Sequence, residues 1–158
     1  MKIAIVHYHL KPGGITTVIK HQLEALSNDC EVLLLTGELP DPPIYGNTIL
    51  IPELGYNNAS TKLSNPEEVA NILSQTIIST FGDKCDVLHI HNPLLAKNSH
   101  FLTILKSMQQ KAISFFCKCM ILRKMDAHWH TIIMNHIFPT ATTVCLITEI
   151  MSYYINLV

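Results

Sequence analysis

The chain has 158 residues, which is enough for one domain of ordinary size. Apolar residues make up 48% and charged residues 15%, a composition that excludes an intrinsically disordered protein. The formal net charge of −1 gives no general attraction to nucleic acid or anionic membranes, so neither is expected as a partner. Five cysteines without framework spacing, and an apolar start too short for a secretory leader, favour a reducing, cytoplasmic setting.

Short apolar segments alternate with segments of helical period through residues 1–111. The apolar segments predict strands near 2–7, 31–36, 48–51 and 86–91. Helices are expected after Gly13-Gly14, between Asn65 and Gly82, and over Phe101–Met108. The second of these has a clear start, because Asn65-Pro66-Glu67-Glu68 combines a capping side chain, a proline at the first helical position and acids in the first turn. The alternation predicts an α/β fold with a Rossmann-like parallel sheet flanked by helices.

Residues 112–158 have a different character. All six glycines lie in residues 1–111, and the apolar residues of the tail follow no clean period. The most apolar stretch, Thr131–Met151, is interrupted by Pro139, Glu149 and other polar residues, so no transmembrane span is expected. We therefore divide the chain into a domain at 1–111 and an atypical, poorly ordered tail at 112–158. Within the tail, the apolar residues near Phe115 are sufficient for one short strand.

Polar and glycine residues follow the first and fourth predicted strands, where a parallel sheet binds its ligands. Gly13 and Gly14 precede a helix, so their backbone N–H groups could bind a phosphate, although a tight strand–helix turn explains them equally well. The segment matches neither Gly-x-Gly-x-x-Gly nor a P-loop. His89, His91 and Asn92 are expected at the same edge, after the fourth strand.

The pairs His7/His9 and His89/His91 have the spacing at which two residues share one face of a strand. Zinc sites normally use three or four ligands, and no matching carboxylate or cysteine set accompanies these pairs. No metal is therefore expected, and the histidines are interpreted as hydrogen-bond partners of a ligand hydroxyl or phosphate.

Two segments together resemble glycosyltransferase family 4. Residues 7–19, His-Tyr-His-Leu-Lys-Pro-Gly-Gly-Ile-Thr-Thr-Val-Ile, are similar to that family's first strand–loop–helix. Residues 86–93, Asp-Val-Leu-His-Ile-His-Asn-Pro, followed by Lys97-Asn98, are similar to its fourth-strand segment. The resemblance covers roughly residues 1–111.

The resemblance implies the N-terminal, acceptor-side half of a GT-B enzyme, which transfers a sugar from a nucleotide-sugar donor to an acceptor with retention and without a metal or other cofactor. It implies that Gly13 and Gly14 approach the donor diphosphate or the acceptor, and that His89, His91 and Asn92 line the cleft. The donor-binding C-terminal domain of that family does not fit in the residues after 111. The chain is therefore expected to be truncated and inactive alone, unless a separately encoded C-terminal half completes it.

The tail can be explained by a change of reading frame. Some members of the family continue with a segment resembling His-Asp-Phe-Ala-Glu-Asp-Gly-Arg-Pro, which this sequence lacks. The codons of Cys119–Trp129, read one nucleotide earlier, permit that segment in order. Two of its residues are forced in that frame: Asp, read across the Met120 and Ile121 codons, and Gly, read across the Met125 and Asp126 codons. The sequence leaves two alternatives open: a free-standing Rossmann-like module that binds a phosphorylated ligand, and a non-functional translation product.

Overall fold

A five-stranded parallel sheet forms the centre of the molecule in the computed structural model, which describes residues 1–41, 47–57, 65–95, 97–109 and 115–118. The strands run in the order β3-β2-β1-β4-β5, and every neighbouring pair is parallel. Their bounds are β1 (Lys2–His7), β2 (Glu31–Thr36), β3 (Asn47–Leu50), β4 (Val87–His91) and β5 (Phe115–Lys118). The predicted parallel α/β sheet is confirmed, and the four strands predicted within residues 1–111 lie within one residue of their expected bounds.

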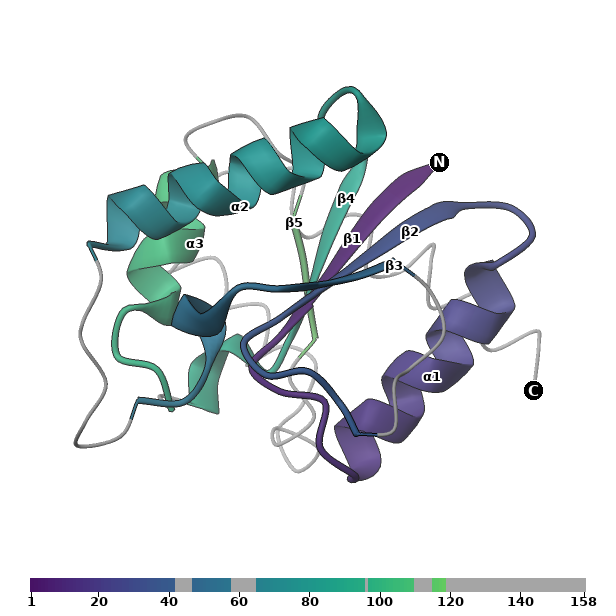
Figure 1. Ribbon diagram of the computed structural model, residues 1–158, viewed down its shortest axis with the longest axis horizontal. Helices are drawn as coiled ribbons and strands as arrows, with labels where there is room; N and C mark the ends of the chain where they lie inside the picture. The colour runs from purple at the N-terminus through teal and green to yellow at the C-terminus, as the bar shows by residue number, and fades with distance from the viewer. Residues whose placement is uncertain (42–46, 58–64, 96, 110–114, 119–158) are drawn as a thin grey trace, which may run out of the picture.

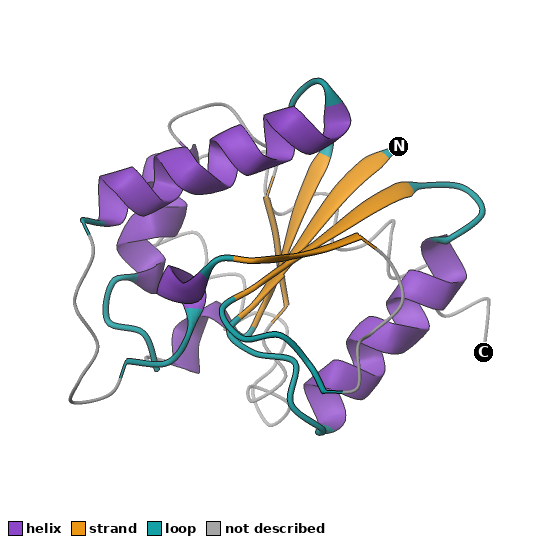
Figure 2. Ribbon diagram, in the orientation of Figure 1, coloured by secondary structure: helices purple, strands orange, loops and turns teal. Residues whose placement is uncertain are grey.

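Helices cover both faces of the sheet, as Figures 1 and 2 show. Helix α1 (Gly14–Leu26) packs on one face, and helices α2 (Pro66–Phe81) and α3 (Phe101–Gln109) pack on the other. Two single turns of 3₁₀ helix, η1 (Pro52–Leu54) and η2 (Pro93–Leu95), follow β3 and β4. The three predicted helices are therefore present.

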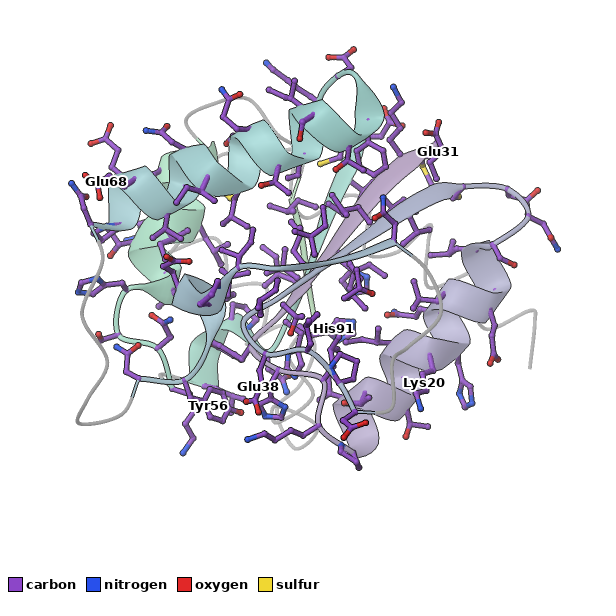
Figure 3. All side chains as sticks on the ribbon, in the orientation of Figure 1. Lys20, Glu31, Glu38, Tyr56, Glu68 and His91 are labelled. Carbon is purple, nitrogen blue, oxygen red and sulfur yellow. The ribbon has the colours of Figure 1, made fainter. Side chains whose placement is uncertain are left out.

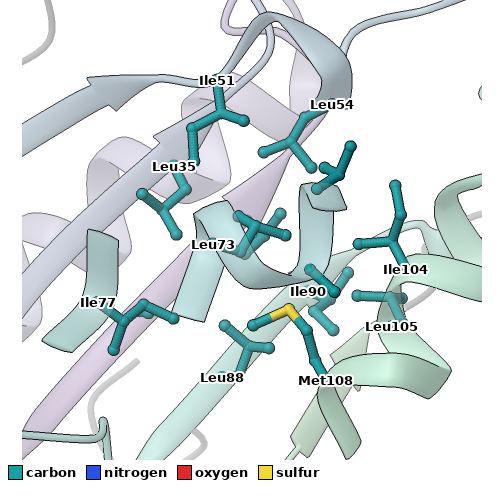
Figure 4. Close-up of a cluster of buried hydrophobic side chains, with 14 of the residues drawn as sticks. Leu35, Ile51, Leu54, Leu73, Ile77, Leu88, Ile90, Ile104, Leu105 and Met108 are labelled. Carbon is teal, nitrogen blue, oxygen red and sulfur yellow. The ribbon is translucent and has the colours of Figure 1, made fainter. Parts of the chain in front are cut away.

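A large cluster of buried hydrophobic side chains lies beneath α2 and α3 (Figure 4). Strand residues such as Val6, Leu35 and Leu88 meet Leu73 of α2 and Leu105 of α3, and all five are almost completely buried. Because successive strand residues point to opposite faces, the residues between them face α1. Burial of this large cluster is the main source of stability for the fold.

Local signals fix the two ends of α2. The Asn65 side chain accepts a hydrogen bond of 3.0 Å from the backbone N–H of Glu67 and caps the first turn. The helix ends at Gly82, whose φ of 72° is the left-handed conformation that glycine adopts without strain.

A close approach of two loops also needs glycine. A Cβ atom on Gly37 would lie 2.0 Å from the backbone nitrogen of Gly55, so the chain after β2 and the chain after η1 can meet only without a side chain there. This contact brings residue 56 toward the carboxyl edge of the sheet.

Strand β5 lies within the segment 112–158 that the sequence sets apart, where a short strand near Phe115 is predicted. The remaining tail, 119–158, including the segment Cys119–Trp129 used in the reading-frame argument, lies outside the described residues. In the part of the chain that the structure describes, no helix has both the length and the apolar character needed to cross a membrane.

Candidate functional site

A cavity of about 180 Å³ opens at the edge of the sheet where β1 and β4 end. This edge is the usual ligand-binding position in parallel sheets, because the loops after neighbouring strands converge there. Its lining comes from the end of β1 and the loop that follows it, the start of α1, the residue that follows Gly55, and the turn after β4. The lining residues are His7, His9, Lys11, Gly13, Gly14, Ile15, Thr16, Tyr56, Asn92 and Leu95.

The predicted glycines lie at the N-terminus of α1, on the wall of this cavity. Gly13 is the N-cap residue, no side chain caps the helix, and its first turn contains no acid. The first intrahelical hydrogen bond runs from Thr17 N–H to Gly13 O at 3.0 Å, so the N–H groups before Thr17 have no carbonyl within the helix. A Cβ on Gly14 would meet nothing within 4 Å, which shows open space beside the backbone. This geometry suits an anionic or acceptor-rich ligand group.

Asn92, after β4, also lines the cavity. It is the single non-glycine residue with positive φ in the described ranges, at 52°, and it is buried. The backbone is held there by the Tyr8 hydroxyl, which donates to Asn92 O at 3.3 Å and Pro93 O at 3.2 Å. Residues in this conformation carry backbone strain that surrounding contacts must offset, and they occur frequently at binding sites.

The predicted histidines of β4 lie away from the cavity lining. His89 pairs with Ile5 in the middle of the sheet, and both His89 and His91 are buried on the α1 face with their rings stacked 4.4 Å apart. His91 Nε2–H donates to Gln22 Oε1 of α1 at 2.9 Å. Figure 3 labels His91 between the sheet and α1. The structure therefore brings Gly13, Gly14 and Asn92 together and places the two histidines behind them.

His7 and His9 connect this buried layer to the cavity. Burial lowers the pKa of His7 from 6.5 to about 4; the hydrogen bond of its Nδ1–H to His91 O, at 3.4 Å, opposes that shift. Burial also lowers the pKa of His9, with a further contribution from the charge of Lys11, while Glu38 acts in the opposite direction. Lys11 Nζ lies 3.1 Å from Glu38 Oε1, and both side chains are largely exposed. Both histidines are consequently neutral at pH 7.

Tyr56 is a lining residue that sequence reasoning missed. It belongs to no motif and reaches the cavity through the contact of Gly37 with Gly55, which connects segments that are distant in the sequence. Within the described ranges, no group of three or more His, Cys, Asp or Glu side chains is arranged to hold a metal ion.

No protein-family model matches this chain, and neither does any curated protein. Among solved structures, it is similar to the crystal structure of a UGT transferase from Siraitia grosvenorii in complex with UDP. The sequence identity is 12% and the TM-score is 0.35; the match covers 75% of this chain and 24% of that chain. A likeness of this size does not bear on function.

Proposed function

We propose that the chain is the N-terminal, acceptor-side half of a GT-B retaining glycosyltransferase that transfers a sugar from a nucleotide-sugar donor. The observation that carries this proposal is the cavity at the carboxyl edge of β1 and β4, lined by Gly13 and Gly14 at the uncapped start of α1 and by Asn92. These are residues of the two segments that resemble glycosyltransferase family 4. The Rossmann-like sheet, with order β3-β2-β1-β4-β5, is the architecture that such a half requires.

The cavity accounts for one side of a transfer site. Its volume of about 180 Å³ is smaller than the roughly 300–1,000 Å³ of pockets that enclose a drug-sized ligand, so it cannot enclose a nucleotide sugar. In this proposal the chain acts in the cytoplasm, needs no metal, and is inactive until a separately encoded C-terminal half, or a frame-restored C-terminal domain, supplies the donor site.

The test is to sequence the DNA downstream of codon 118 and to express a version in which the frame is restored. We expect the adjoining frame to encode the His-Asp segment and a second Rossmann-like domain. The restored protein should consume a nucleotide sugar from a panel of UDP- and GDP-sugars, whereas the chain of 158 residues should not. Gly14→Asp, which places a carboxylate at the start of α1, should reduce turnover at least 100-fold. Ser27→Asp, at the other end of α1 and exposed, is the matched control.

Turnover of a nucleotide sugar by the 158-residue chain alone would contradict the proposal, as would a downstream sequence without a second domain. A second candidate is a free-standing module that binds a phosphorylated ligand, which the uncapped start of α1 beside the cavity also suits. Tight binding of a nucleotide sugar by the chain alone, measured by calorimetry, would favour that module.

A further inference from the structure

Tyr56 and His9 form an aromatic corner at the mouth of the cavity. Their ring centroids lie 4.9 Å apart with an interplanar angle of 82°, an edge-to-face arrangement. The Tyr56 ring also lies 5.2 Å from the buried ring of Tyr8, yet Tyr56 itself is 39% exposed. In Figure 3, Tyr56 is labelled at the end of the molecule where α1 begins. One part of the ring is thus packed and the other is accessible from the cavity.

The backbone on both sides of Tyr56 is held in place. Asn98 Nδ2 donates to Gly55 O at 2.8 Å, and Asn57 N–H donates to Lys97 O at 2.9 Å. Asn98 is itself buried, so it attaches the segment that carries Tyr56 to the chain entering α3. An exposed aromatic ring held in this way loses little conformational entropy when a ligand packs against it.

The hydrogen-bonding role of His9 is fixed by its neighbour. The backbone N–H of Lys11 donates to His9 Nδ1 at 3.3 Å, so the neutral imidazole carries its proton on Nε2. His9 therefore carries a donor on Nε2 beside the partly exposed ring of Tyr56, and both residues line the cavity.

A sugar ring matches these two groups. A pyranose presents C–H groups on its face, which pack against the electron-rich face of an aromatic ring, and hydroxyl oxygens at its periphery, which accept from an N–H donor. The cavity volume of about 180 Å³ equals roughly six water volumes of about 30 Å³, which is room for one such ring.

We propose that Tyr56 and His9 form a subsite for a single sugar ring, with Tyr56 stacked on the ring face and His9 Nε2–H donating to a ring hydroxyl. Resting on the proposed function, this assigns the acceptor to the carbohydrates, and Tyr56 and His9 become the residues that determine acceptor specificity.

Saturation-transfer NMR on the full chain tests this assignment with defined probes. Methyl glucopyranoside, galactopyranoside and mannopyranoside are each compared with sorbitol, which carries the hydroxyls without the ring, and with uridine, which carries a flat base. We expect at least one pyranoside to receive saturation and sorbitol to receive at least fivefold less. Tyr56→Ala and Tyr56→Leu should each lower the pyranoside signal at least fivefold, whereas Tyr56→Phe should stay within twofold. His9→Phe, which retains an aromatic edge but removes the donor, should lower it two- to fivefold.

Ile72→Ala, on the exposed side of α2 away from the cavity, is the control and should leave the signal unchanged. Equal signals for wild type and both Tyr56→Ala and Tyr56→Leu, or no pyranoside signal at all, would overturn the subsite, and so would binding of uridine alone. The proposed function is judged separately by turnover in the frame-restored protein. If the frame-restored protein turns over and Tyr56→Ala leaves its acceptor KM unchanged, the subsite is wrong and the proposed function stands. If the chain binds a pyranoside but the frame-restored protein shows no turnover, the proposed function is wrong and the subsite stands.

Discussion

The two faces of the sheet differ in the polarity of their buried side chains. Beneath α2 and α3 the buried residues of β1, β2 and β4 are apolar up to the carboxyl edge, where Val6, Leu35 and Ile90 lie. Beneath α1, each of three strands changes from apolar to polar toward the carboxyl edge: Ile5 to His7, Leu34 to Thr36, and Val87 to His89 and His91. Burial of apolar area on the first face supplies stability without directional requirements. Buried polar groups on the second face must meet hydrogen-bond partners, and His91 meets one in Gln22, which links α1 to the strand that ends at the cavity.

The largest effect is expected on the apolar face. Leu73→Ala removes a fully buried side chain of α2 and should lower the free energy of unfolding by about 3 kcal/mol, from lost burial and the cavity left behind. Ile72→Ala, on the neighbouring and 44% exposed position, should change it by less than about 0.5 kcal/mol. Urea unfolding followed by circular dichroism measures both. Similar changes in the free energy of unfolding for the two variants would mean that burial of Leu73 against the sheet does not stabilise the fold as described.

Acid should selectively weaken the polar face. Because the folded state lowers the pKa of His7 from 6.5 to about 4, the folded protein binds fewer protons than the unfolded chain between those values. Stability from this group is therefore complete above pH 6.5 and falls as the pH drops toward 4, by about 3 kcal/mol in all.

The measurement is a set of urea unfolding curves between pH 7.5 and 4 for the wild type and for His7→Asn, which cannot titrate in this range. The difference in the free energy of unfolding between the wild type and His7→Asn should shrink steadily as the pH falls from 6.5. Parallel curves would show that His7 accepts a proton in the folded state without cost, and that the α1 face is more open than its burial indicates.

The contact between α1 and β4 gives a smaller effect. Gln22→Leu removes the acceptor of the 2.9 Å bond from His91 Nε2–H, and should lower the free energy of unfolding by about 2 kcal/mol, because both side chains are buried. Lys20→Ala, exposed on the same helix, is the control. If Gln22→Leu leaves the free energy of unfolding unchanged, water or a rotated side chain replaces this bond.

The sequence predicted the sheet more fully than the site, for reasons visible in particular residues. Strands and α2 follow from local signals: apolar runs for β1 and β2, the Asn65 cap, and Gly82 at the helix end. His-x-His spacing predicted a shared face for His89 and His91, but nothing local marks how deep in a strand a residue lies.

Tyr56 shows the other limit. Its place at the cavity depends on two glycines, Gly37 and Gly55, that meet from separate loops, and on Asn98 much later in the chain. Contacts between residues far apart in the chain produce no periodic pattern in the sequence, so the place of Tyr56 could not be predicted from it. Gly13 and Gly14 were identifiable because a strand, a short loop with a glycine pair and a helix follow one another in the chain.

The helices on the two faces also differ at their N-termini, and this gives the smallest expected effect. Helix α2 has the Asn65 cap and the acids Glu67 and Glu68 in its first turn, whereas α1 begins at Gly13 with neither. Asn65→Ala should lower the free energy of unfolding by about 1 kcal/mol, because a capped N–H group loses its acceptor. Gly13→Asp should raise it by about 0.5 kcal/mol, since a carboxylate there both caps the helix and meets its positive end.

The added side chain fits, because a Cβ on Gly13 has its nearest neighbour, Lys11 O, at 3.8 Å. Urea unfolding at pH 7 measures the stability of both variants, and nucleotide-sugar turnover by the frame-restored protein measures function. If α1 leaves its first turn uncapped in order to bind a ligand, Gly13→Asp gains stability and loses turnover, while Asn65→Ala loses stability and keeps turnover. A Gly13→Asp protein that gains stability and still turns over the sugar would show that the start of α1 is a tight turn and not a ligand site.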